Sequence, residues 1–119
     1  MQQIFAEADQ VLADQPVGRQ EEKLCLLASQ FLGLSNPTRL SILLILANQG
    51  ETRVGVLVKQ LNAPQPRVSD HLRMLCSLGY VQVRRQGRAA YYSIADGRVI
   101  EMISWGMSML EDNRQHIEY

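Results

Sequence analysis

Apolar residues recur every three or four positions along the first third of the chain, which is the spacing of a helix with one buried face. The pattern predicts an amphipathic helix over residues 3–14 and a second helix from about residue 20 to residue 34. Pro16 and Gly18 separate the two helices, because neither residue type suits a helix interior.

The most apolar stretch of the chain runs over residues 39–47. It is apolar nearly all round rather than on one side, so we expect it to form the buried central helix. Asn36 can cap the start of this helix, and Pro37 suits its first position. Gly50 is expected to end it.

Two more helical patterns follow the central helix. Thr52 is expected to cap a short helix that runs to Leu61. The turn at residues 62–64 leads into a further helix over residues 65–78, which Gly79 closes.

The last third of the chain changes from a β-rich to a helical pattern. Residues 80–83 and 90–94 are β-rich and flank a basic, glycine-containing turn at residues 84–88, so they predict a hairpin. A final helix is expected from near Asp96 to about Arg114.

This order predicts a mainly α fold with a small β-hairpin wing (α+β), in a single domain of 119 residues. A helix, a short turn, a second helix and a hairpin with a basic tip make a winged helix-turn-helix. Residues 52–78 would supply the helix-turn-helix and residues 80–95 the wing. In that architecture the second helix enters the major groove of DNA and the hairpin tip reaches the neighbouring backbone.

The distribution of charge agrees with a DNA partner, although the formal net charge is zero. Residues 64–98 carry six arginines against Asp70 and Asp96, whereas residues 1–33 and 99–119 are both acidic. Arginine makes bidentate contacts with phosphate and guanine. The positive charge is therefore concentrated in the segment that is predicted to face DNA.

The helix predicted over residues 65–78 has two different faces. Val68, Leu72 and Leu75 share one face and should pack on the central helix. The expected DNA contacts lie at the start of this helix, on its other face and on the wing: Gln65, Arg67, Ser69, Asp70, His71, Arg73, Arg84, Arg85 and Arg88.

The chemistry expected of these side chains differs. Arg67 and Arg73 can donate to guanine or phosphate, and Asp70 can accept from cytosine or orient an arginine. Gln65 can reach a base edge from the exposed end of the helix, and Ser69 can bond a phosphate.

Four stretches resemble the ArsR/SmtB family of bacterial metal- and stress-responsive repressors: Asn36–Leu40, Leu61–Leu72, Leu78–Val81 and Gly87–Ile94. The resemblance implies a homodimer that sits on a palindromic operator and leaves it when an inducer binds. It also suggests a packing or phosphate-contacting role for His71. One departure is Pro64, where the family usually has a helix-capping serine, and this can shift the start of the recognition helix.

The last predicted helix is apolar on two opposite sides. These residues are Val99, Ile100, Ile103, Met107 and Leu110 on one side, and Met102, Trp105 and Met109 on the other. A terminal helix with two apolar faces needs two partners, its own domain and a second surface. We therefore expect a homodimer formed by the N-terminal helix (residues 1–18) and the C-terminal helix (residues 96–114), with two recognition helices roughly 34 Å apart.

The metal sites of the resembling family are absent at the matching positions. At the short helix both thiolates are missing, and Arg53 stands in one of their places. On the last helix the matching residues are Asp96, Arg98, Met109 and Asp112. Two carboxylates without an imidazole make a poor zinc site, so we expect neither a metal nor a cofactor.

The two thiols leave the signal open. Cys25 and Cys76 can both be small packing residues, the commonest fate of free cysteine. Alternatively, oxidation or thiol capture at Cys76 shifts the recognition helix and releases DNA. Capture of a soft metal by both cysteines and a methionine, or control by abundance or a partner without any inducer, are the remaining alternatives.

An enzyme is not expected. Ser69, Asp70 and His71 are the residue types of a hydrolytic triad, but neighbours on a helix diverge by about 100° and cannot form a relay. The sequence also lacks a phosphate-binding glycine loop and the common hydrolase motifs. The alternative to a DNA-binding regulator is a winged-helix protein-interaction module without DNA binding, which would not need a basic wing.

Sequence also bears on the cellular compartment. The apolar stretch Ile42–Ala47 is too short to span a bilayer, and the N-terminus lacks the basic start and long apolar run of an export signal. We therefore expect a cytoplasmic protein without a membrane partner. Its expected partners are double-stranded operator DNA and a second copy of the chain, and its inducer is unknown.

Overall fold

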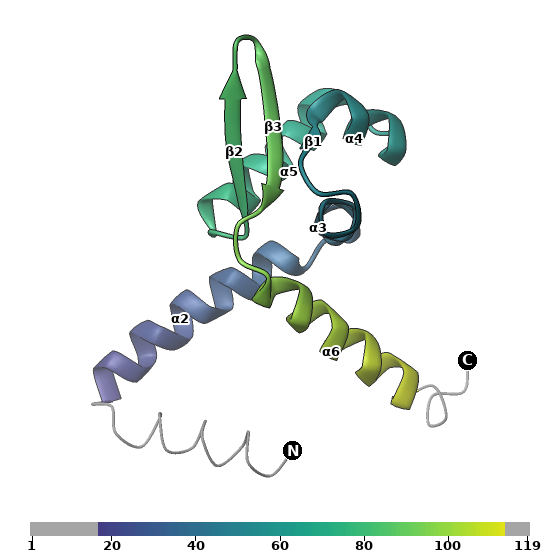
Figure 1. Cartoon of the computed structure of the whole chain (residues 1–119). Coiled ribbons are helices and arrows are strands. Elements are labelled where there is room, and N and C mark those ends of the chain that lie inside the picture. Colours follow the sequence, from purple (N-terminus) through teal and green to yellow (C-terminus); the bar gives the residue numbers. More distant parts are fainter. Residues whose placement is uncertain (1–16, 114–119) are drawn as a thin grey trace. The chain divides into compact units, whose positions relative to one another are not determined.

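In the computed structural model, which describes residues 17–113, the predicted elements follow one another in the expected order (Figure 1). The chain divides after Leu32 into two units, which are described separately. Helix α2 spans Val17–Leu34, starting before the predicted residue 20. The helix predicted over residues 3–14 lies outside the described residues. None of the described helices is long and apolar enough to cross a membrane.

Helix α3, Pro37–Gln49, is the central helix predicted from the sequence. The Asn36 side chain caps it by accepting the N–H groups of Thr38 and Arg39, at 2.9 and 3.2 Å. Gly50 ends the helix with a φ of 76°, a conformation that disfavours residues with a Cβ. Both predicted helix signals are therefore confirmed.

The segment after α3 differs from the prediction. Thr52 does not cap a helix: Thr52–Arg53 form a short strand, β1, and the Thr52 hydroxyl donates to the Gly50 carbonyl at 2.9 Å. Helix α4, Val54–Leu61, starts after Arg53 and has no side-chain cap. A strand of two residues is too short to show the alternation of buried and exposed positions that predicts a strand. Its partner strand, moreover, lies far along the chain.

Helix α5, Gln65–Ser77, follows the short turn. Two of its first N–H groups, those of Arg67 and Val68, are satisfied without a serine, because the Pro64 carbonyl accepts both at 3.1 Å. The departure from the family's capping residue therefore leaves the predicted start at Gln65 in place. The predicted core face is confirmed, since Val68, Leu72 and Leu75 are all fully buried.

The hairpin consists of β2, Val81–Gln86, and β3, Ala89–Ile94, and the sheet order is β1-β3-β2. The strands pair antiparallel as far as Gln86 and Ala89, so the turn contains only Gly87 and Arg88. Gly87 has a φ of 60°, which a two-residue hairpin turn requires. The residues 84–86, predicted to belong to the turn, are part of the strand.

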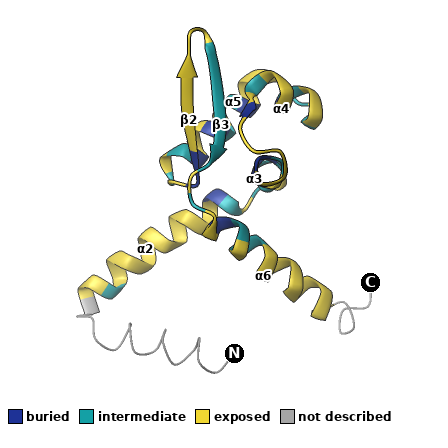
Figure 2. Ribbon diagram, in the orientation of Figure 1, coloured by how far each residue is buried: buried dark blue, intermediate teal, exposed yellow. Residues whose placement is uncertain are grey.

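Helix α6 spans Arg98–Asn113. Asp96 precedes it, and its carboxylate accepts the backbone N–H of Arg98 at 3.0 Å. Val99 is buried and Ile103 half-buried, but every residue from 104 to 113 is exposed, as the colouring of α6 shows (Figure 2). Only the first part of the predicted stripe therefore packs on its own unit.

The core of the second unit joins α3 to α4, α5, the hairpin and the start of α6. Its fully buried members are Ile42, Leu43, Leu46, Leu57, Val68, Leu72, Leu75 and Val99. This core holds α5 and the hairpin in fixed positions and leaves one face of each at the surface.

Candidate nucleic-acid interface

The exposed face of α5 carries most of the polar residues that were predicted to contact DNA. Arg67, Asp70 and Arg73 are exposed on the side opposite the buried residues of the same helix, and Gln65 is exposed in its first turn. Ser69, at the edge of this face, is less exposed than these residues and is half-buried. The helical period therefore brings these side chains to one surface.

Two of these side chains pair with each other. Nη1 of Arg73 lies 2.8 Å from Oδ1 of Asp70, one helical turn earlier, and the two side chains are 77% and 69% exposed. An ion pair this exposed contributes little to stability and exchanges easily. Asp70 therefore orients Arg73, whereas no acidic side chain within residues 17–113 pairs with Arg67.

His71 is half-buried between α5 and α3 and is not on the exposed face of α5. Its Nδ1 is 3.2 Å from Nη1 of Arg39 in α3, and Nε of Arg39 donates to the carbonyl of Gly33. Because arginine only donates, Nδ1 must accept, and the proton of neutral His71 belongs on Nε2. Burial, followed by the charges of Arg39 and Arg67, lowers the pKa of His71. His71 thus connects α5 to α3.

On the wing, Arg84 is held by an acidic partner. Its Nη2 and Nε lie 2.7 and 3.0 Å from the two carboxylate oxygens of Glu51, and its guanidinium stands 4.6 Å from the centre of the Tyr91 ring. Nη1 donates to Gln86 at 2.9 Å. The bond from Arg84 lowers the pKa of Glu51. Arg84 therefore brings no uncompensated charge to the wing.

Arg85 and Arg88 differ from Arg84. Successive residues of a strand point to opposite faces, so Arg85 shares the face of Val81, which packs in the core, and Arg84 shares the face of Tyr91. Arg88 belongs to the two-residue turn. Both arginines are exposed, and among the described residues no acidic side chain pairs with them.

The sequence interpretation missed three charged residues near the wing. Glu51 was not considered as a partner, Arg53 was considered only as the replacement of a thiolate, and Lys59 was not singled out. Arg53 leaves β1 with its guanidinium 5.8 Å from the Tyr91 ring centre, and Lys59 is exposed on α4. The positive charge of residues 34–63 was the one signal that could have drawn attention to them.

The two thiols lie in different surroundings. Cys25 is exposed on α2, whereas Cys76 is half-buried near the end of α5. Burial raises the pKa of the Cys76 thiol, so less of it is thiolate at neutral pH than in an exposed cysteine.

Two of the positions that correspond to the family's metal ligands, Asp96 and Arg98, form an ion pair with each other. Nη2 of Arg98 lies 2.7 Å from Oδ2 of Asp96. The side-chain and backbone hydrogen bonds from Arg98 lower the pKa of Asp96 to about 2. Within residues 17–113, no three His, Cys, Asp or Glu side chains are grouped as a metal site would require.

Comparison with known proteins agrees with this geometry. A family model described as "bacterial regulatory protein, arsR family" matches residues 36–83. A helix-turn-helix-type transcriptional regulator of Methanocaldococcus jannaschii is 41% identical over 76 residues, which are 64% of this chain and 85% of that protein. The chain belongs to the ArsR family.

Other relatives match over more of the chain. A transcriptional repressor SmtB homolog of Synechocystis is 34% identical over 100 residues, 84% of this chain and 75% of that protein. The solution structure of a homodimeric winged helix-turn-helix DNA-binding domain from Mycobacterium bovis has a TM-score of 0.73 and 30% identity, and the match covers 90% of this chain and 97% of that one.

These findings confirm the family resemblance and the winged helix-turn-helix predicted from the sequence. They identify the chain as a transcriptional regulator and do not favour the alternative of an interaction module without DNA binding. The family and the fold are those of regulators, not of enzymes.

Proposed function

We propose that this ArsR-family chain binds duplex operator DNA as a homodimer and represses transcription until a signal releases it. Helix α5 would enter the major groove with Gln65 and Arg67 toward the base edges, and the wing would approach the adjacent backbone with Arg85 and Arg88. The observation that carries the proposal is that these three arginines are exposed and, among the described residues, have no acidic partner.

The other predicted contacts take different roles in this proposal. Arg73 would reach the DNA together with Asp70, and the pair would separate or rotate as DNA phosphates replace the carboxylate. His71 would position α5 through Arg39, and Ser69 would reach a phosphate from the edge of the helix. Arg84 would fix the wing through Glu51 instead of contacting DNA.

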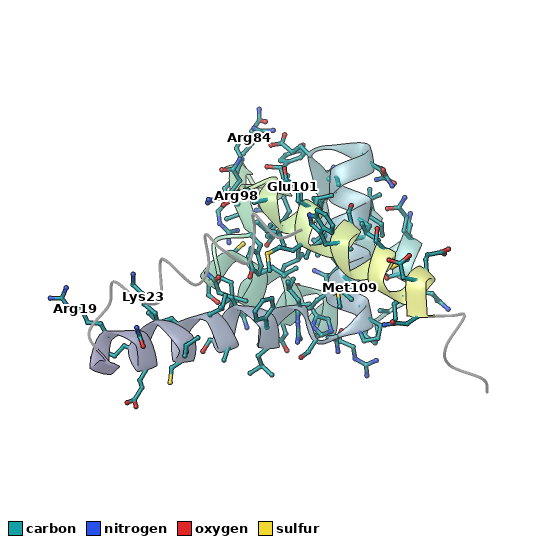
Figure 3. All side chains as sticks on the ribbon, turned by 90° about the horizontal axis from the view of Figure 1, so that it is seen from below. Arg19, Lys23, Arg84, Arg98, Glu101 and Met109 are labelled. Carbon is teal, nitrogen blue, oxygen red and sulfur yellow. The ribbon has the colours of Figure 1, made fainter. Side chains whose placement is uncertain are left out.

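A homodimer is supported by the exposed length of α6. Trp105, Met107, Met109 and Leu110 are 56 to 64% exposed, and Met109 stands out from the helix in Figure 3. Apolar side chains this exposed along consecutive turns are typical of a surface that another chain covers. The Mycobacterium bovis relative is a homodimer, which agrees with this proposal.

Repression is proposed because relatives such as the SmtB homolog are repressors. The signal is left open between a thiol reagent, a soft metal and no inducer at all. The raised pKa of the Cys76 thiol makes this residue a slow nucleophile at neutral pH, so a sensor at Cys76 would need a strong oxidant or a soft metal ion.

Fluorescence anisotropy with duplex DNA from the region upstream of the protein's own gene tests the proposal. The logarithm of affinity should fall with the logarithm of salt concentration, by about 0.9 for each phosphate contact. Arg67→Gln should weaken binding to this DNA, and Arg85→Gln should also flatten the salt dependence. The matched control is Arg19→Gln on α2, where Arg19 projects from the helix (Figure 3). Affinity that is independent of salt, or unchanged by both interface variants, would contradict the proposal.

A further inference from the structure

A hollow of about 400 Å³ lies between the first turn of α4 and the turn end of the hairpin. Its walls come from three parts of the second unit: the end of β1, the start of α4, and the residues of the hairpin from Arg88 to Ala90. Figure 1 shows α4 beside β1 and β3, with the hairpin extending past it. The alanines at positions 89 and 90 leave room there because their side chains are short.

Three cations line this hollow and no acidic residue does. They are Arg53, Lys59 and Arg88, and all three are exposed. No acidic side chain of residues 17–113 pairs with them, in contrast to Arg84, which pairs with Glu51. Three positive charges around one concave site repel one another, so an anion that enters the site is favoured.

The backbone adds donors to the same wall. The first residues of α4 line the hollow, and Arg53, which precedes the helix, makes no side-chain capping bond. The first N–H groups of a helix lack partners within the helix. A Cβ built on Gly55, in this first turn, would meet no atom within 4 Å, so the space above it is open.

We propose that this hollow binds a phosphate group, and that the phosphate belongs to the backbone of the bound DNA beside the wing. The inference rests on the proposed function and extends it to Arg53 and Lys59, two residues outside the predicted interface. Arg88 connects the predicted interface to the hollow, since it lies both on the wing tip and in the hollow. A duplex seated on α5 and the wing would have to pass its backbone close to this point, whereas a free anion would have no such constraint.

Two variants test the site with matched controls. Lys59→Gln should weaken DNA binding several-fold and flatten its salt dependence by less than about 0.9, the value for one whole phosphate contact, because Arg53 and Arg88 remain beside the phosphate. Lys23→Gln, an exposed lysine on α2 shown in Figure 3, should change neither. Gly55→Ala should also weaken DNA binding, because the new methyl group occupies the approach to the backbone N–H groups.

Gly55→Ala separates a local effect from a folding defect. Alanine is the better helix former, and the methyl group contacts no other residue, so the melting temperature of Gly55→Ala should be equal to that of the wild type or higher. Weaker DNA binding together with undiminished thermal stability supports the phosphate site. A melting temperature below that of the wild type would contradict the open space inferred above Gly55.

The remaining outcomes distinguish this inference from the proposed function. If Arg67→Gln weakens binding but Lys59→Gln and Gly55→Ala equal the wild type, the phosphate site is wrong and the proposed function stands. If the wild-type chain does not bind DNA at any salt concentration, both fail. Inorganic phosphate is titrated at constant ionic strength as the last arm. If it displaces DNA from the wild type but much less from Lys59→Gln, free phosphate and DNA compete for the hollow, as the proposal expects. If it binds the wild type through Lys59 without displacing DNA, the hollow takes a free anion only, and the assignment to DNA is overturned.

Discussion

Nη2 of Arg84 lies 2.7 Å from Oε1 of Glu51, and this ion pair connects strand β2 to the segment that follows α3. The two residues are 33 positions apart in the sequence. Tyr91 on the neighbouring strand supports the guanidinium from one side. The pair therefore ties the hairpin to the segment after α3 and, at the same time, cancels one positive charge of the wing.

Neutralising Glu51 should strengthen DNA binding. In Glu51→Gln the amide oxygen can still accept from Arg84, but the negative charge beside the wing is gone, so the affinity for duplex DNA should rise several-fold at low salt and less at high salt. Anisotropy titrations at two salt concentrations measure this. Glu21→Gln on α2 makes the same change in net charge and should have a much smaller effect. Weaker binding by Glu51→Gln would mean that the position of the hairpin matters more than its charge.

Stability should depend on pH through His71. Its pKa is lowered in the folded chain by burial and by Arg39 and Arg67, with Asp70 opposing, so the unfolded chain binds the proton more readily. The contribution is present above the usual pKa of 6.5 and is lost as the pH falls from there through the lowered pKa of the folded state. Urea unfolding at several pH values should show a decrease in the free energy of unfolding below about pH 6.5.

His71→Gln is the matching control for this decrease. The glutamine oxygen can accept from Arg39 but does not titrate in this range, so the variant should lose less stability between neutral and mildly acidic pH than the wild type. An identical loss in both proteins would assign the pH dependence to other groups.

Much of this fold could be predicted because its signals are local. The cap at Asn36, the helix end at Gly50 and the two faces of α5 depend on residues a few positions apart, and all three were confirmed. The charge of residues 64–98 likewise located the basic segment without any structure.

The parts that were missed depend on pairing between distant segments. Strand β1 exists because Thr52 and Arg53 pair with Tyr92 and Tyr91, which no local pattern shows. The turn was predicted too long, and only the observed register puts Arg84 and Arg85 on opposite faces. Which arginines keep an uncompensated charge follows from such pairings, so the candidate interface could be predicted as a region but not residue by residue.

The two cysteines should react at different rates. Cys25 is exposed, while burial hinders access to Cys76 and raises the pKa of its thiol, and only the thiolate is nucleophilic. Labelling with a thiol reagent near neutral pH should modify Cys25 first, so Cys25→Ser should react slowly and Cys76→Ser quickly. The difference should vanish in urea. Equally fast labelling of Cys76 in the folded chain would remove this objection to a thiol sensor on α5.

Association of two chains should depend on the exposed end of α6. Leu110 is 64% exposed, so Leu110→Gln should weaken the dimer without a loss of helical signal by circular dichroism. Val83→Gln on the hairpin, where the side chain is 40% exposed, should leave the dimer intact. Sedimentation equilibrium compares the two variants. A wild-type chain that is monomeric at micromolar concentration, or a dimer unaffected by Leu110→Gln, would contradict the proposed role of α6.

Hydroxyl-radical footprinting of the chain on DNA from its own upstream region tests the central claim, that α5 and the wing of two chains hold one duplex. The predicted result is two symmetric sets of protected positions, centred about 10 base pairs apart, with the outer protection abolished in Arg88→Gln. A single protected patch, or no protection at concentrations where the chain is folded, would contradict the account.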